Sequence, residues 1–235
     1  EKRRALITRA VTRGLDPRAP LRDSGIPWLG EIPAHWEAVR LKFLATEPLS
    51  YGANEAALED NPAFPRFVRI TDVDPTGNLR DETFKSLPPE VAEPYLLRDG
   101  DVLFARSGAT VGKAFIYKPT WGAACFAGYL IRCRCNAMRL LPDFLYAYTQ
   151  TETYWGQVGE GTIQATIQNF SAEKYADLVL PVPAVDEQSR IVAHIAAETA
   201  KLNSLRSATE RTIALLSERR AALIAAAVAG KIPLS

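Results

Sequence analysis

Residues 186–229 read DEQSRIVAHIAAETAKLNSLRSATERTIALLSERRAALIAAAVA, with apolar side chains at helical spacing. Steps of four and three residues, with an extra step of four between Thr209 and Ile213, are typical of a coiled-coil seam with a stutter. About 40 residues at 1.5 Å each predict a helix roughly 60 Å long, which cannot bury its apolar stripe by itself. We expect these seam residues to bury against another helix: Ile191, Ile195, Leu202, Leu205, Ile213, Leu216 and Leu223.

The end of this helix occurs a second time at the start of the chain. Residues 1–15, EKRRALITRAVTRGL, and residues 218–232, ERRAALIAAAVAGKI, are identical at seven of fifteen positions with an offset of 217. Self-similarity at a fixed period indicates repeated architecture, here a globular part followed by a helix. We therefore expect the chain to begin at the tail of one unit and to contain the next, as a piece of something longer.

Between the two helical ends the sequence predicts an extended connector and then an α+β domain. Prolines in residues 16–33 exclude a continuous helix there, and the apolar spacing in residues 142–155 predicts one. Short apolar runs predict strands at residues 67–71, 101–106, 113–117 and 130–135. Because strands and helices do not alternate regularly, the expected fold class is α+β. The expected organisation is helix end and connector at 1–24, globular domain at 25–185 and distal long helix at 186–235.

Charge is unevenly distributed along the 235 residues. The formal net charge is +1, but residues 1–24 carry seven bases and three acids, residues 101–135 five and one, and residues 187–235 seven and four. Basic islands suit a nucleic-acid partner, although a solvated surface explains any single island. No apolar run reaches the roughly 18 to 20 residues of a membrane span, and the basic opening lacks a secretory pattern. We therefore expect a cytoplasmic chain without a membrane partner.

Cysteines and histidines are too few and too scattered to predict a metal site. Cys125, Cys133 and Cys135 lack C-x-x-C spacing, and His35 and His194 are separated by most of the chain. We expect buried strand cysteines, no metal and no cofactor.

Three motifs are close to catalytic ones, but each lacks a required part. Residues 108–114, GATVGKA, have three residues between the glycines where a phosphate-binding loop has four, and Ala follows the Lys. Residues 61–64, NPAF, lack one Pro of the DNA amino-methyltransferase loop. The acids at residues 72–82 lack the Lys-bearing strand of a nuclease and suit a turn. We therefore expect no catalytic residues.

Polar residues suited to DNA follow the predicted strand at 101–106. Arg106, Thr110 and Lys113 lie in a glycine loop, and cations and hydroxyls are the groups that contact phosphates and base edges. A tight hairpin with incidental charge explains the loop equally well. In residues 130–135, LIRCRC, alternation places Arg132 and Arg134 on one face, available to solvent or ligand, and the cysteines on the other.

A second candidate lies in residues 161–169, GTIQATIQN, where apolar residues alternate with amides and hydroxyls. Gln164, Gln168 and Asn169 carry amides of the kind that pair with adenine in the major groove. A polar strand face is the alternative.

Together these passages resemble the DNA-sequence specificity subunit of type I restriction-modification systems. The similar passages are SGIPWLGEIPAHWEAVRLKFL (24–44), LRDGDVLFARSGATVGKA (97–114), GTIQATIQNFS (161–171), LPVPAVDEQSRIVAHI (180–195) and ERRAALIAAAVAGKI (218–232). They span nearly the whole chain.

The resemblance implies a non-catalytic subunit with two target recognition domains, separated by two long helices that form an antiparallel coiled coil. Each domain reads one half of a bipartite site in double-stranded DNA. The helices set the spacing of the half-sites and dock methyltransferase (modification) subunits, and through them the restriction subunit. Because one recognition domain is present here, the resemblance implies pairing with a second specificity half through the coiled coil.

The resemblance also divides the candidate residues. Arg106, Thr110 and Lys113 fall in a passage that many such domains share, so they suit the fold or backbone contacts. Base choice is expected in the less typical stretches 51–69, 118–129 and 162–169, which add Arg69 and Lys118 to the DNA-binding candidates. A helical oligomerisation or adaptor protein without DNA binding stays open as the alternative function.

Overall fold

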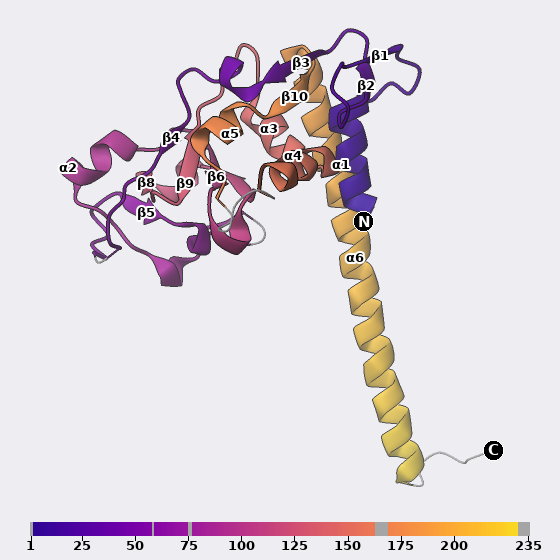
Figure 1. Ribbon diagram of the computed structural model, residues 1–235. Coiled ribbons are helices and arrows are strands. Elements are labelled where there is room, and N and C mark those ends of the chain that lie inside the picture. The colour runs from indigo at the N-terminus through magenta and orange to yellow at the C-terminus, as the bar shows by residue number, and fades with distance from the viewer. Residues whose placement is uncertain (1, 58, 75–76, 163–168, 230–235) are drawn as a thin grey trace. The chain divides into compact units, whose positions relative to one another are not determined.

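The computed structural model describes residues 2–57, 59–74, 77–162 and 169–229 (Figure 1). Its helices are α1 (Lys2–Arg13), α2 (Pro89–Ala92), α3 (Pro142–Tyr148), α4 (Glu152–Thr162), α5 (Ala172–Ala176) and α6 (Val185–Val228). Its strands are β1 (Leu21–Asp23), β2 (Glu31–Pro33), β3 (Glu37–Arg40), β4 (Ser50–Tyr51), β5 (Arg66–Val68), β6 (Val102–Ala105), β7 (Ala114–Ile116), β8 (Ala124–Phe126), β9 (Leu130–Cys133) and β10 (Val179–Val182). The expected α+β class is confirmed. The chain divides into two compact units, Glu1–Val192 and Ala193–Ser235.

The first unit is built around a four-stranded antiparallel sheet in the order β4-β9-β6-β7. All four residues of β6 are buried, as expected of a central strand covered on both faces. The strands predicted at 113–117 and 130–135 pair as β7 and β9. Phe104 of β6 stacks on Tyr175 of α5, with ring centroids 4.7 Å apart. The sheet is thereby fixed to the segment that precedes β10.

The strand predicted at residues 67–71 is shorter than expected. It pairs as β5 in parallel with β8, and the chain then turns through a 3₁₀ helix at Ile70–Asp72. The fully buried carboxylate of Asp72 accepts the Arg69 backbone N–H at 2.8 Å. It also accepts two bonds from the Arg69 guanidinium, at 2.9 and 2.8 Å. This local bonding competes with strand pairing and ends β5.

The single helix predicted at 142–155 is two helices, α3 and α4. Between them, the Thr151 hydroxyl donates to the Tyr148 carbonyl at 2.8 Å and accepts the Tyr154 N–H at 3.1 Å. A hydroxyl that accepts such an orphan N–H starts a new helix. The sequence spacing did not show this break. Phe144 and Tyr148 are buried, as one continuous helix would also predict.

Two small two-stranded sheets complete the first unit, and one of them joins its two ends. The connector predicted as extended forms a β1–β2 hairpin, in which Leu21 pairs with Pro33. β3 pairs antiparallel with β10, which joins residues 37–40 to residues 179–182. α1 packs against α3 and β2 and buries Ile7, Ala10 and Val11.

The first turns of α6 belong to the first unit. Gln188 is buried; it accepts the Leu141 N–H at 2.8 Å and donates to the carbonyls of Arg139 and Pro183 at 2.7 and 2.9 Å. Ile191 is also fully buried. The unit therefore extends to Val192, past the boundary expected at residue 185. Ile191 is thus buried within the first unit itself.

The second unit is the remainder of α6. Four of its seam residues are exposed: Leu205, Ile213, Leu216 and Leu223. Ile195 and Leu202 are half-buried. None of the helices in the described ranges is long and apolar enough to cross a membrane.

Cys125 and Cys133 are buried in strands, as predicted, and Cys135 is half-buried. Burial raises the pKa of the Cys125 thiol to about 12. Among the residues that the structure describes, no cluster of His, Cys, Asp and Glu has the arrangement of a metal site.

Candidate nucleic-acid interface

Several predicted site residues meet at one end of the four-stranded sheet, which we call the loop end. Here Ala105 of β6 pairs with Leu130 of β9, and Phe104 pairs with Ala114 of β7. The loop of residues 106–113 closes the β6–β7 hairpin at this end. The chain therefore presents the loop beside the ends of three neighbouring strands.

Two buried tyrosines hold this loop. The Tyr154 hydroxyl donates to the Gly112 carbonyl at 2.7 Å. The Tyr175 hydroxyl donates to the Ala105 carbonyl at 2.7 Å and accepts the Gly112 N–H at 3.0 Å. Burial is the main cause that raises the pKa of both phenols, so both remain protonated donors at neutral pH. Both ends of the loop are thus tied to α4 and α5 by hydrogen bonds.

Gly112 has to be glycine for two independent reasons. Its φ of 85° lies in the left-handed region that other residues rarely adopt. A Cβ atom there would lie 2.7 Å from Cζ3 of Trp155. The close packing of α4 on the loop therefore fixes the direction in which Lys113 leaves it.

The candidates at the loop end have different environments. Lys113 is exposed, and Thr110 is half-buried with its hydroxyl donating to the Ser107 carbonyl at 3.3 Å. The Arg106 guanidinium lies over the Tyr51 ring, 4.7 Å from its centroid, and donates to the Gly128 carbonyl at 3.4 Å. Of this group, Lys113 keeps its charge most available to a ligand.

The loop end also receives the last residue of the predicted amide segment. Asn169 forms an isolated antiparallel bridge with Ser107 and is exposed. The next residue, Phe170, donates its N–H to the Arg106 carbonyl at 2.8 Å. Gln164 and Gln168 lie outside the described residues, and Gly161 and Thr162 belong to α4 instead of the expected strand.

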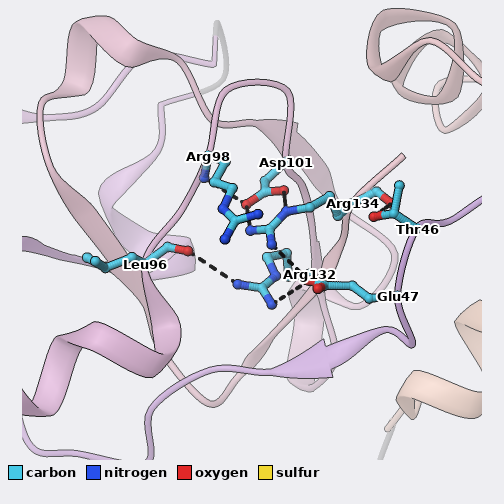
Figure 2. Close-up of polar contacts among 7 residues, drawn as sticks. All are labelled: Thr46, Glu47, Leu96, Arg98, Asp101, Arg132 and Arg134. Carbon is cyan, nitrogen blue, oxygen red and sulfur yellow. Dashed lines mark hydrogen bonds and ion pairs between the residues drawn. The ribbon is translucent and has the colours of Figure 1, made fainter. Parts of the chain in front are cut away.

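The opposite end of the sheet, which we call the paired end, uses its arginines internally (Figure 2). Arg134 makes two bonds of 2.8 Å to the buried carboxylate of Asp101 and one of 3.0 Å to Glu47. Arg132 donates to Glu47 at 2.8 Å and to the Leu96 carbonyl at 3.3 Å. A bidentate pair of this kind is the strong form of an arginine–carboxylate contact.

The expectation that Arg132 and Arg134 face solvent or ligand is therefore corrected. Their side chains are 11% and 15% exposed, and their charges are balanced within the protein. The hydrogen bond to Asp101 is the first cause that raises the pKa of Arg134, whereas burial lowers that of Arg132. Alternation placed both on one face correctly, but it could not show that Glu47 and Asp101 lie on the same face.

The remaining candidates lie elsewhere. Arg69 is bonded to Asp72 and to the Thr83 carbonyl, at 2.7 Å from the latter, so its charge is also used internally. Lys118 is exposed and follows β7 beyond Ile116, which pairs with Val102 at the paired end. The structure thus groups Arg106, Thr110, Lys113 and Asn169 and separates them from the others.

A cleft of about 880 Å³ in the first unit borders the loop end. Thr110 and Lys113 of the loop line this cleft. It is also lined by Arg3, Arg4 and Arg80, which are not among the predicted site residues. Arg3 and Arg4 lie in the basic island of residues 1–24, which is a signal in the sequence for a charged surface. No such pattern surrounds Arg80.

Neither a protein-family model nor a curated protein matches the sequence. Solved structures do match. The HsdS subunit from Thermoanaerobacter tengcongensis has a TM-score of 0.63 and 18% identity, over 98% of this chain and 51% of that chain. A structure from work on complex assembly and conformational transition of the type I R-M system has a TM-score of 0.62 and 19% identity, over 86% and 50%.

A third match is the type I restriction-modification S subunit from M. genitalium, with a TM-score of 0.50 and 12% identity, over 74% of this chain and 41% of that one. The expected resemblance is thereby confirmed at the level of the fold. The chain spans about half the length of the specificity subunits that it matches.

Proposed function

We propose that this chain is a half of a type I specificity subunit, a sequence-specific DNA-binding protein that reads one half of a bipartite site. The observation that carries the proposal is the difference between the two ends of the sheet. At the loop end, exposed Lys113 stands on a loop fixed by Tyr154 and Tyr175, beside exposed Asn169. At the paired end, arginines are neutralised by Glu47 and Asp101.

In this proposal phosphate contacts supply salt-dependent affinity, and a few base contacts supply about 1–3 kcal/mol of selectivity each. One domain alone is expected to bind with modest affinity. Linking two half-site readers raises the affinity through effective concentration.

The exposed apolar seam of α6 supports the second part of the proposal. Leu205, Ile213 and Leu216 are exposed along a helix that needs a partner to bury them. We infer that this face pairs with a second specificity half in a coiled coil and that the helices dock methyltransferase subunits, and through them the restriction subunit. The chain itself is then a cytoplasmic, non-catalytic subunit that uses no cofactor, and companion subunits supply methyl transfer and cleavage.

The test is selection of bound DNA from a random duplex pool by the purified chain at two salt concentrations, alone and with a methyltransferase subunit. Enrichment of one short half-site is the expected result. No enrichment in either condition, together with salt-insensitive background, would instead favour the adaptor function for which the α6 seam is the motivating observation.

A matched pair of variants locates the binding surface. Lys113→Ala is expected to weaken binding to all duplexes about equally and to lower the salt slope by about 1, as removal of a phosphate contact does. Lys118→Ala removes the same charge near the paired end and should have the smaller effect. A larger effect at Lys118 would contradict the assignment of the loop end.

A further inference from the structure

Three segments that are distant in the sequence bring cations to the cleft beside the loop end. Arg3 and Arg4 come from α1, Arg80 from the segment before β6, and Lys113 from the loop. Asp74 is the acid among the described lining residues, and its carboxylate accepts the Asn78 N–H at 2.9 Å. The charged side chains of the described lining are therefore predominantly cationic.

These cations are available, unlike those of the paired end. Within the described part of the chain, the side chains of Arg4, Arg80 and Lys113 have no hydrogen bond or ion pair, and all three are exposed. Arg3 makes one exposed bond of 3.3 Å to Gln150. Three charges that the protein leaves unneutralised around one cleft are a surface for an anion.

The distribution of charge favours a polymer over a small molecule. The buried lining residues are uncharged: Ile7, Gly112, Phe115 and Thr149. A small-molecule site orients its ligand with a few converging polar groups inside the pocket. Here the charges lie in solvent on separate segments, which suits successive phosphates that neutralise several cations together.

We propose that α1 is part of the DNA interface, with Arg4 and Arg80 binding phosphates of the duplex that Lys113 also contacts. The helix that precedes the recognition domain then positions DNA as well as packing on the domain. This inference rests on the proposed function and assigns it two residues that no sequence motif indicated.

The test compares two double variants of the full chain. Arg4→Ala with Arg80→Ala removes two cleft charges. Arg9→Ala with Arg18→Ala removes two exposed charges that do not line the cleft, one of them on the same helix. Binding to a duplex with the selected half-site and to a shuffled duplex is measured between 50 and 200 mM salt, and thermal unfolding verifies that each variant is folded.

Loss of two phosphate contacts lowers the slope of log K against log salt concentration by about 2. The ratio of wild-type to variant affinity should therefore fall about tenfold between 50 and 200 mM salt. We expect this for the cleft variant on both duplexes, with the selected sequence unchanged, and little change for the control variant. An unchanged slope for a folded cleft variant, an equal loss in the control, or a changed sequence preference would overturn the inference while leaving the selected half-site, and so the proposed function, intact. Failure of the wild type to bind either duplex would overturn both.

Discussion

α1 and the last turns of α6 are similar in sequence but differ in their exposure to solvent. Ile7 and Val11 of α1 are 1% and 0% exposed. Their counterparts in the repeat, Ile224 and Val228, are 55% and 85% exposed. The apolar face of α1 is covered by contacts that include α3 and β2, whereas the corresponding side chains of α6 are exposed.

The comparison indicates what the end of α6 lacks. The face of α1 that buries Ile7 and Val11 completely has the same side chains at the end of α6, where they are exposed. Exposure of apolar surface to water costs about 25 cal/mol per Å². We expect the end of α6 to pack on a second specificity half as α1 packs on the first unit here.

The largest expected effect concerns the seam that precedes this end. Leu202→Asp with Leu216→Asp should abolish assembly, because each buried Leu contributes about 1.5–3 kcal/mol and a carboxylate adds a desolvation penalty. Analytical ultracentrifugation, of the chain alone and with methyltransferase subunits, measures this. Ser204→Asp with Ser207→Asp adds the same charge on the other face and should assemble normally. Unchanged assembly of the leucine variant would contradict the seam.

A smaller effect separates the two copies of the repeat directly. Ile7→Ala should lower the free energy of unfolding by about 2–5 kcal/mol, as removal of a buried isoleucine does. Ile224→Ala makes the same change at an exposed helix position and should alter it by less than about 0.5 kcal/mol. Urea unfolding followed by tryptophan fluorescence compares them. Equal destabilisation would mean that the two faces are buried alike in solution.

The smallest expected effect tests how tightly α1 is packed. Ala10 is buried, and Ala10→Leu should cost about 1–3 kcal/mol because the added methylenes have no space. Ala227, its counterpart, is half-buried, so Ala227→Leu should be close to neutral in the isolated chain. A neutral result at both positions would show that α1 packs loosely.

Helices and strands that depend on the spacing of apolar side chains within one short segment were predicted correctly from the sequence. Runs of apolar residues gave β6, β7 and β9 to within a residue or two, and helical spacing gave α6. The break between α3 and α4 was missed because one Thr151 hydroxyl decides it. The shortening of β5 depends in the same way on the Asp72 carboxylate.

The candidate site was predicted in part. The loop residues Arg106, Thr110 and Lys113 do meet at one end of the sheet, because the hairpin that carries them is local. Arg4 lies in the basic island of residues 1–24, but nothing in the sequence indicates that α1 and the segment of Arg80 line one cleft.

By itself the sequence determined the long apolar seam, the repeat of its end and the hairpin with its glycine loop, since each is written in the periodicity of neighbouring residues. Tertiary structure alone decided which charges remain for a partner. Arg132 and Arg134 are taken by Glu47, 85 and 87 residues away in the chain, while Lys113 is left in solvent. Ion pairing depends on distance in space, and the fold brings these distant acids to some arginines and not to others.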